Sequence, residues 1–165
     1  MRRSSDGRGW AFVHPRGARE RAEDLEEVRE MIESGELDVA VDELRWLVGG
    51  CSEFVEAHAL LGELALAQGD AVLARGHFGF AVQLGLKALQ RGNVSSGPLP
   101  YSQPANRAFY EAGRGLVRAL VKLGMIDKAT TLVMDLVRLD PGDPLKLRGL
   151  IDDARTGGLP IVELE

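Results

Sequence analysis

Gly69-Asp70-Ala71-Val72-Leu73-Ala74 is one of three related stretches in this 165-residue chain, and the spacing of these stretches decides the fold. In each stretch a glycine stands five residues before an alanine, and the pairs are Gly35 and Ala40, Gly69 and Ala74, and Gly124 and Ala129. The first two glycines are 34 residues apart, a typical length for a repeat of two antiparallel helices. The sequence therefore predicts an all-α protein built from helical hairpins.

The middle copy has the fullest pattern of small and large apolar residues, at Leu61, Gly62, Ala65, Ala74, Phe78 and Ala81. Small residues at these places let two helices pack closely and stack on the next pair. The pattern resembles the tetratricopeptide repeat family, whose leucine-glycine pair is matched by Leu61-Gly62, its small contact residues by Ala74 and Ala81, and its aromatic residue by Phe78. The other two copies are degenerate, since Glu27-Val28 and Leu116-Val117 replace the leucine-glycine pair. The resemblance implies a right-handed helical-hairpin solenoid with three repeats.

The register predicts repeats at 21–54, 55–88 and 110–143, with an insert between the second and third. The middle of the insert, 91–104, is rich in Gly, Ser and Pro and predicts a long loop, whereas its ends are expected to lengthen the flanking helices. A capping helix at 144–156 completes a helical domain of residues 21–157, with seven helices and no sheet. A basic N-terminal arm, 1–20, precedes this domain and is expected to be partly disordered or packed on the first repeat, and a tail, 158–165, follows it.

Residues that favour the start or the end of a helix support this division. Asp70 and Asp143 stand where N-caps are expected, and Pro104 and Pro144 fall in predicted first turns. The pairs Gly49-Gly50 and Gly157-Gly158 are expected to end the helices before them.

Composition favours one soluble domain. The chain is 45% hydrophobic with a net charge of −5, and it has no apolar run near the length needed to cross a membrane. A short apolar run near the start is too brief for an export signal, so a cytoplasmic location is expected. The single cysteine, Cys51, has no partner for an internal disulfide and is expected to be structural.

No enzyme signature is found, and no cofactor or metal is expected. His14, His58 and His77 are scattered without the spacing of metal ligands or a catalytic pair, and packing roles are expected for them. Stretches of carboxylates such as 23–27 match the start of a helix, where the helix dipole favours negative charge.

The resemblance places a concave groove on the first helix of each repeat. Transferred by register, its lining includes Arg29, Glu63, Leu66, Arg114, Arg118, Val121 and Lys122. Arg114, Arg118 and Lys122 recur at every fourth position and form one basic stripe, suited to carboxylates of a partner. An ordinary solvated helix face explains the stripe equally well.

The leading hypothesis is a non-enzymatic protein–protein interaction module or scaffold that holds an unidentified, acidic peptide or protein. A variant has the tail of the same or a neighbouring molecule reach the stripe, which would be self-association through the termini. The alternative is binding of nucleic acid or an anionic surface through the arm at 1–20, because residues 1–21 carry a local charge of +4. Nucleic acid is the less favoured partner, since the rest of the chain carries −9 and repels phosphates.

Overall fold

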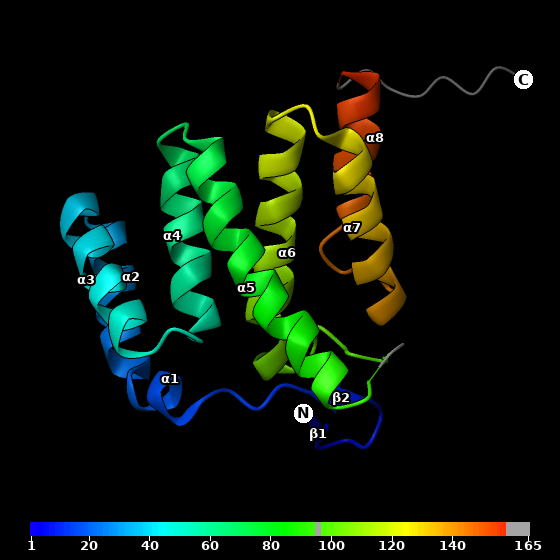
Figure 1. Ribbon diagram of the computed structural model, residues 1–165, viewed down its shortest axis with the longest axis horizontal. Coiled ribbons are helices and arrows are strands. Elements are labelled where there is room, and N and C mark those ends of the chain that lie inside the picture. Colours follow the sequence, from blue (N-terminus) through cyan, green and yellow to red (C-terminus); the bar gives the residue numbers. More distant parts are fainter. Residues whose placement is uncertain (95–96, 158–165) are drawn as a thin grey trace, which may run out of the picture.

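The computed structural model describes residues 1–94 and 97–157, and over these residues the regular secondary structure is helical apart from one short hairpin (Figure 1). The elements are β1 (Arg2–Arg3), β2 (Trp10–Ala11), α1 (Arg16–Glu20), α2 (Ala22–Glu33), α3 (Leu37–Gly50), α4 (Val55–Ala67), α5 (Ala71–Arg91), α6 (Pro104–Lys122), α7 (Ile126–Leu139) and α8 (Leu147–Thr156). The all-α prediction is confirmed. Within the described ranges there are eight helices instead of seven, because the single turn of α1 is too short to give a helical periodicity.

The helices are arranged as antiparallel hairpins that follow one another in chain order (Figure 1). α2 packs on α3, α4 on α5 and α6 on α7, while α4 also contacts α3 and α6. α8 packs against both α6 and α7. Two groups of buried side chains fill this array: the first lies around α2, α3 and one side of α4, and the second joins α4, α5, α6, α7 and α8.

The three repeated glycines end the first helix of each hairpin. Gly35, Gly69 and Gly124 have φ angles of 79°, 82° and 72°, in the left-handed region that favours glycine. Beyond Gly69, the amide of Asp70 donates to the carbonyl of Ala65 (2.9 Å), and the Asp70 carboxylate accepts from the amide of Leu73 (2.9 Å). The predicted N-cap at Asp70 is therefore confirmed.

The side chain of Phe78 lies between two glycines of neighbouring helices. A Cβ added at Gly62 of α4 would stand 2.7 Å from the Phe78 ring, and one added at Gly115 of α6 would stand 2.3 Å from it. Phe78 itself is fully buried. Only residues without a side chain leave room for the ring there, so these two glycines set how closely α4 and α6 approach α5.

The insert lengthens both flanking helices, as predicted: α5 continues to Arg91 and α6 begins at Pro104. The described part of the connection is held to the helices by hydrogen bonds. The hydroxyl of Tyr110 donates to the carbonyl of Leu99 (2.6 Å), and the amide of Tyr101 donates to the carboxylate of Asp140 (2.8 Å). Burial raises the pKa of the Tyr110 hydroxyl, which keeps it a donor.

The N-terminal arm is anchored by one buried amide. Asn106 of α6 is fully buried; its Oδ1 accepts from the amide of Phe12 (3.0 Å), and its Nδ2 donates to the carbonyls of Trp10 and Pro100 (2.9 Å each). The start of the arm thus packs on α6 and the segment before it. The end of the arm contacts the first repeat, as the sequence predicted, because Ala18 of α1 is buried with side chains of α2 and α3. The hairpin of β1 and β2 was unexpected, because strands of two residues have no detectable alternation.

The chain enters α8 three residues later than predicted. Asp143 and Lys146 have positive φ angles (45° and 53°), so the backbone turns here, and Pro144 lies in this turn instead of in the first turn of the helix. The carboxylate of Asp143 still caps α8, because it accepts from the amides of Leu147 (2.7 Å) and Arg148 (3.2 Å). Gly157 ends the helix with a φ of 62°, and the tail at 158–165 lies outside the described residues.

No described helix combines the length and the apolar character that crossing a membrane requires.

Candidate functional site

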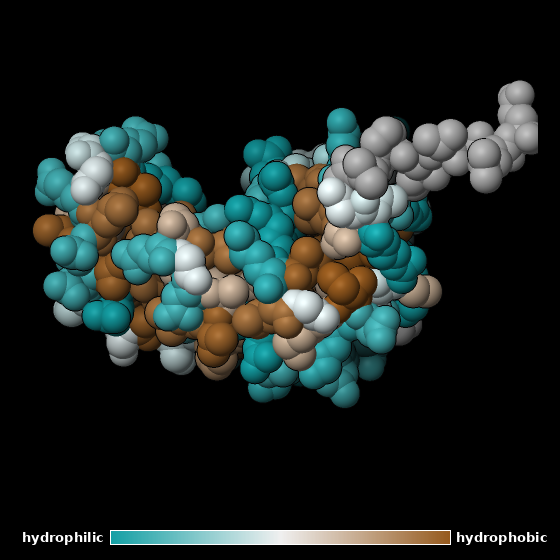
Figure 2. Space-filling view, turned by 90° about the horizontal axis from the view of Figure 1, so that it is seen from above, coloured by the Kyte–Doolittle hydropathy of each residue, from teal (hydrophilic) through white to brown (hydrophobic). Residues whose placement is uncertain are grey.

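A hollow of about 480 Å³ lies on the face shared by α2, α4 and α6. In Figure 2 the outline is indented on the upper side, between the end that holds α2 and α3 and the larger mass beside it. The residues that line the hollow are Arg29, Glu56, Ala59, Leu60, Glu63, Tyr101, Pro104, Arg107, Ala108 and Glu111. Its floor is therefore partly apolar, and its walls carry charges of both signs.

Ion pairs cross this face between neighbouring helices. Arg29 of α2 pairs with Glu56 of α4 (Nη2 to Oε2, 3.2 Å), and Arg118 of α6 pairs with Glu63 of α4 (Nη1 to Oε2, 3.3 Å). All four side chains are 40–46% exposed, so each pair contributes at most about 1 kcal/mol to stability. Each pair links α4 to a neighbouring helix on this face, and three of the four residues, Arg29, Glu56 and Glu63, line the hollow.

The structure disperses the residues that the sequence assigned to the groove. Arg29 and Glu63 line the hollow. Arg114 and Lys122 are exposed on α6, and Arg118 is half-buried in its ion pair. The two apolar members face the protein interior: Leu66 is buried in the core, and Val121 packs against it.

Sequence reasoning missed the part of the lining that comes from the insert. Tyr101 precedes α6, and its hydroxyl donates to Oε1 of Glu111 (2.7 Å), the contact that most raises the pKa of Tyr101. The guanidinium of Arg107 stands over the Tyr101 ring, 5.9 Å from its centroid. Arg107 lies in the first turn of α6, which is absent from the repeat register. In the sequence, the expected lengthening of this helix was the only signal that could have identified Arg107 as a lining residue.

Two histidines that look scattered in the sequence meet across the hairpin of α4 and α5. The ring centroids of His58 and His77 are 6.2 Å apart, and the His58 ring also lies 4.6 Å from that of Phe80. Nε2 of His58 contacts the carbonyl of Ser52 (2.9 Å), which assigns the proton to that nitrogen. No three His, Cys, Asp or Glu side chains in the described ranges are grouped as a metal site requires. We therefore assign the pair a packing role.

We expect this histidine pair to make the protein less stable in mild acid. Burial lowers the pKa of both rings below the ordinary value of 6.5, and the charges of His58 and Arg45 add to the effect at His77. The two histidines therefore bind protons more readily in the unfolded chain than in the folded protein. Their contribution to the free energy of unfolding is complete above about pH 6.5 and is lost as the pH falls below it. Urea unfolding of the wild type at neutral and mildly acidic pH measures the loss. A His58→Gln/His77→Gln variant should lose less stability over the same interval, and an unchanged loss would contradict the assignment.

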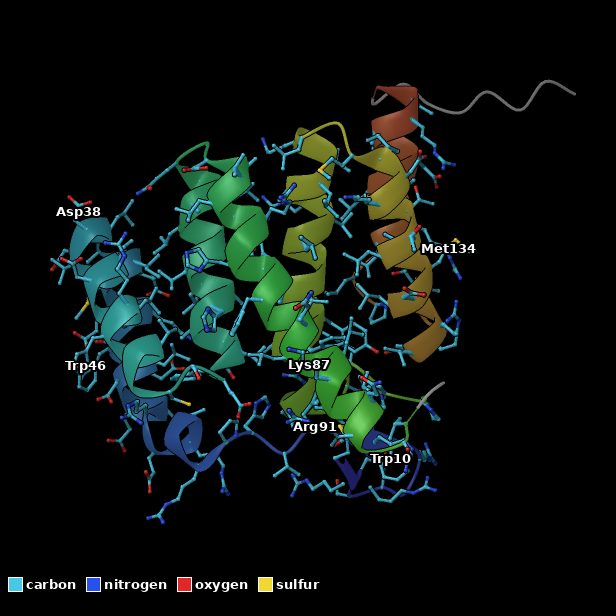
Figure 3. The ribbon with its side chains drawn as sticks, viewed as in Figure 1. Trp10, Asp38, Trp46, Lys87, Arg91 and Met134 are labelled. Carbon is cyan, nitrogen blue, oxygen red and sulfur yellow. The ribbon has the colours of Figure 1, made fainter. Side chains whose placement is uncertain are left out.

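Exposed large apolar side chains occur on α3, α5 and α7, helices that contribute no residue to the lining of the hollow. Figure 3 shows Trp46 at the outer side of α3 and Met134 projecting from α7. These side chains are 60% and 61% exposed, and Phe80 and Leu86 of α5 are 45% and 42% exposed. The second helices of the hairpins, α3, α5 and α7, therefore each expose at least one large apolar side chain.

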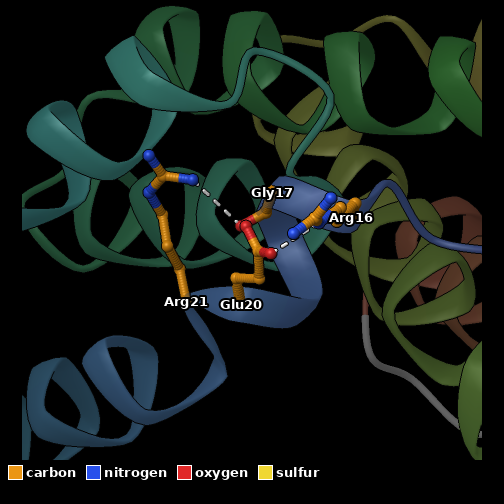
Figure 4. Close-up of polar contacts among 4 residues, drawn as sticks. All are labelled: Arg16, Gly17, Glu20 and Arg21. Atoms are coloured by element: carbon orange, nitrogen blue, oxygen red, sulfur yellow. Dashed lines mark hydrogen bonds and ion pairs between the residues drawn. The ribbon is translucent and has the colours of Figure 1, made fainter.

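The cations of the arm are partly engaged within the chain. Figure 4 shows the ion pair of Arg16 with Glu20 (2.6 Å) and the hydrogen bond from Arg21 to the carbonyl of Gly17 (3.1 Å). The guanidinium of Arg3 stands over the Trp10 ring at 4.5 Å from its centroid. The ion pair offsets one positive charge of the arm, and the other two contacts orient guanidinium groups without changing the net charge.

Comparisons of the chain with family models, with curated proteins and with solved structures each find no match.

Proposed function

We propose that the chain is a non-enzymatic protein-binding module of the tetratricopeptide type, a short right-handed solenoid that receives a peptide in a concave groove. The observation that carries the proposal is the hollow shared by α2, α4 and α6, with its partly apolar floor and its charges of both signs. The glycine turns at Gly35 and Gly69, which are 34 residues apart, and the pairing of successive helices support the family resemblance. We propose the cytoplasm as its compartment, where Cys51 would stay reduced.

The charges of α6 indicate which peptide the groove would take. Arg107, Arg114 and Lys122 form no ion pair within the described ranges, whereas Arg118 is already paired with Glu63. The unpaired cations follow one another along α6 at separations of seven and eight residues, which keeps them near one face of the helix. A peptide that lies along this edge with acidic side chains would neutralise them.

We expect peptides selected by display on the full chain to be acidic and to bind α6. An Arg114→Glu/Lys122→Glu variant should bind these peptides about tenfold more weakly, because two exposed attractive pairs become repulsive. The same affinity should fall as salt is added. Fluorescence anisotropy of labelled peptides measures both effects.

The matched control reverses two exposed cations on the other helices, Lys87 of α5 and Lys128 of α7. A Lys87→Glu/Lys128→Glu variant has the same change of net charge and should retain the wild-type affinity. Equal losses in the two variants would show that net charge alone, and not the groove, attracts the peptides. If the selected peptides bind the Arg114→Glu/Lys122→Glu variant as tightly as the wild type, the groove assignment is refuted.

A further inference from the structure

A second, smaller pocket lies between the N-terminal arm and the helices, away from the hollow on α2, α4 and α6. Its volume is about 140 Å³. Most of its walls are apolar, and they include Phe12 and Val13 of the arm, Leu84 and Ala88 of α5, and Phe109 of α6. A cavity of about 150 Å³ accommodates benzene. The pocket therefore has room for one side chain of the size of leucine or phenylalanine.

Two opposite charges stand beside this apolar space. Glu53 lies just before α4, and Arg91 is the last residue of α5; both line the pocket and both are exposed. Neither forms an ion pair in the described part of the chain. Figure 3 shows Arg91 at the lower end of α5, above the arm. His14, the remaining titratable group of the lining, is held by a 2.7 Å contact between its Nε2 and the carbonyl of Ala105.

An apolar pocket beside one carboxylate and one guanidinium is complementary to a free amino acid, which carries an ammonium, a carboxylate and a side chain. We propose that this pocket binds a free α-amino acid with an apolar side chain of leucine or phenylalanine size. The side chain occupies the space between Phe12, Leu84 and Phe109, the α-carboxylate faces Arg91, and the α-ammonium faces Glu53. Because both charges are exposed, most of the affinity comes from the apolar contact, and the expected Kd is on the order of 1 mM.

Binding at this place also holds the arm to the helical body, because the arm supplies Phe12, Val13 and His14 to the walls. The amide of Phe12 donates to buried Asn106, so its hydrogen exchange reports release of the arm. A ligand that bridges the arm and α5 should slow exchange of this amide in proportion to its occupancy.

The test is an NMR titration of the full chain with phenylalanine and leucine, followed through the methyl groups of Val13 and Leu84 and the exchange of the Phe12 amide. N-acetylphenylalanine lacks the ammonium and phenylalanine amide lacks the carboxylate, so each should bind two- to fivefold more weakly than phenylalanine. Serine, which has no apolar side chain, should cause no shift.

Two variants test which charged residue of the pocket faces which charged group of the amino acid. Arg91→Gln should remove the preference for phenylalanine over its amide, and Glu53→Gln should remove the preference over the N-acetyl derivative. Lys87→Gln, on the same helix outside the pocket, is the matched control and should keep both preferences. The proposal is overturned if phenylalanine at tens of millimolar shifts none of these signals, or if both blocked derivatives bind as well as the free amino acid.

Discussion

Phe78→Ala is expected to lower the free energy of unfolding by about 3–5 kcal/mol. The ring is fully buried and lies between Gly62 and Gly115, so its removal leaves a cavity where three helices meet. Gly115→Ala should also destabilise the protein, by about 1–3 kcal/mol, because the new Cβ would stand 2.3 Å from the ring. Urea unfolding measures both losses.

A double-mutant cycle tests whether the two losses share one cause. In a Phe78→Leu background, Gly115→Ala should cost less than it does in the wild type, since a smaller side chain leaves room for the added methyl group. Gly76→Ala is the matched control on α5: no atom lies within 4 Å of its added Cβ, and it should stabilise the protein slightly. If Gly115→Ala costs the same in both backgrounds, the ring does not set the approach of α6.

Asn106→Ala is expected to release the N-terminal arm and to cost about 3 kcal/mol or more. The substitution removes three hydrogen bonds and leaves the amide of Phe12 and the carbonyl of Trp10 without this partner, while the carbonyl of Pro100 keeps its bond from the amide of Gln103. A buried group left unsatisfied costs about 1–3 kcal/mol. Hydrogen exchange of the Phe12 amide and limited proteolysis within residues 1–15 should both accelerate, while exchange in α2 and α3 should stay near the wild-type rate.

Gln90→Ala serves as the control, because Gln90 is an exposed residue of α5 near the same end of the molecule. It should leave stability and arm exchange unchanged. An Asn106→Ala variant whose Phe12 amide exchanges at the wild-type rate would show that other contacts suffice to hold the arm.

The hairpin layout was predictable because its signals are local. A glycine with a positive φ is needed wherever the first helix of a hairpin turns into the second, and the chain has glycine at all three such places. The start of α8 was harder, since Asp143 caps the helix from four residues before Leu147 instead of from the N-cap position. The anchor of the arm was not predicted, because Asn106 is 94 residues from Phe12 in sequence and no local pattern links them.

Of the residues that the register assigned to the groove, Arg29 and Glu63 line the hollow. The register treated Arg118 as a free cation, whereas the structure pairs it with Glu63. Glu63 is 55 residues from Arg118 in the sequence, on a different helix. Only the folded structure shows that these two helices are neighbours. Tyr101 and Arg107 belong to the insert, which no repeat register covers.

The central claim is that the face of α2, α4 and α6 receives a peptide, and mapping a bound peptide by NMR tests it most directly. A selected acidic peptide is titrated into the isotope-labelled full chain, and amide shifts are compared between this face and that of α3, α5 and α7. The account predicts that the largest shifts fall at Arg29, Glu63, Arg107 and Arg114. Shifts concentrated instead around Trp46, Phe80 and Met134, with the hollow unaffected, would contradict it.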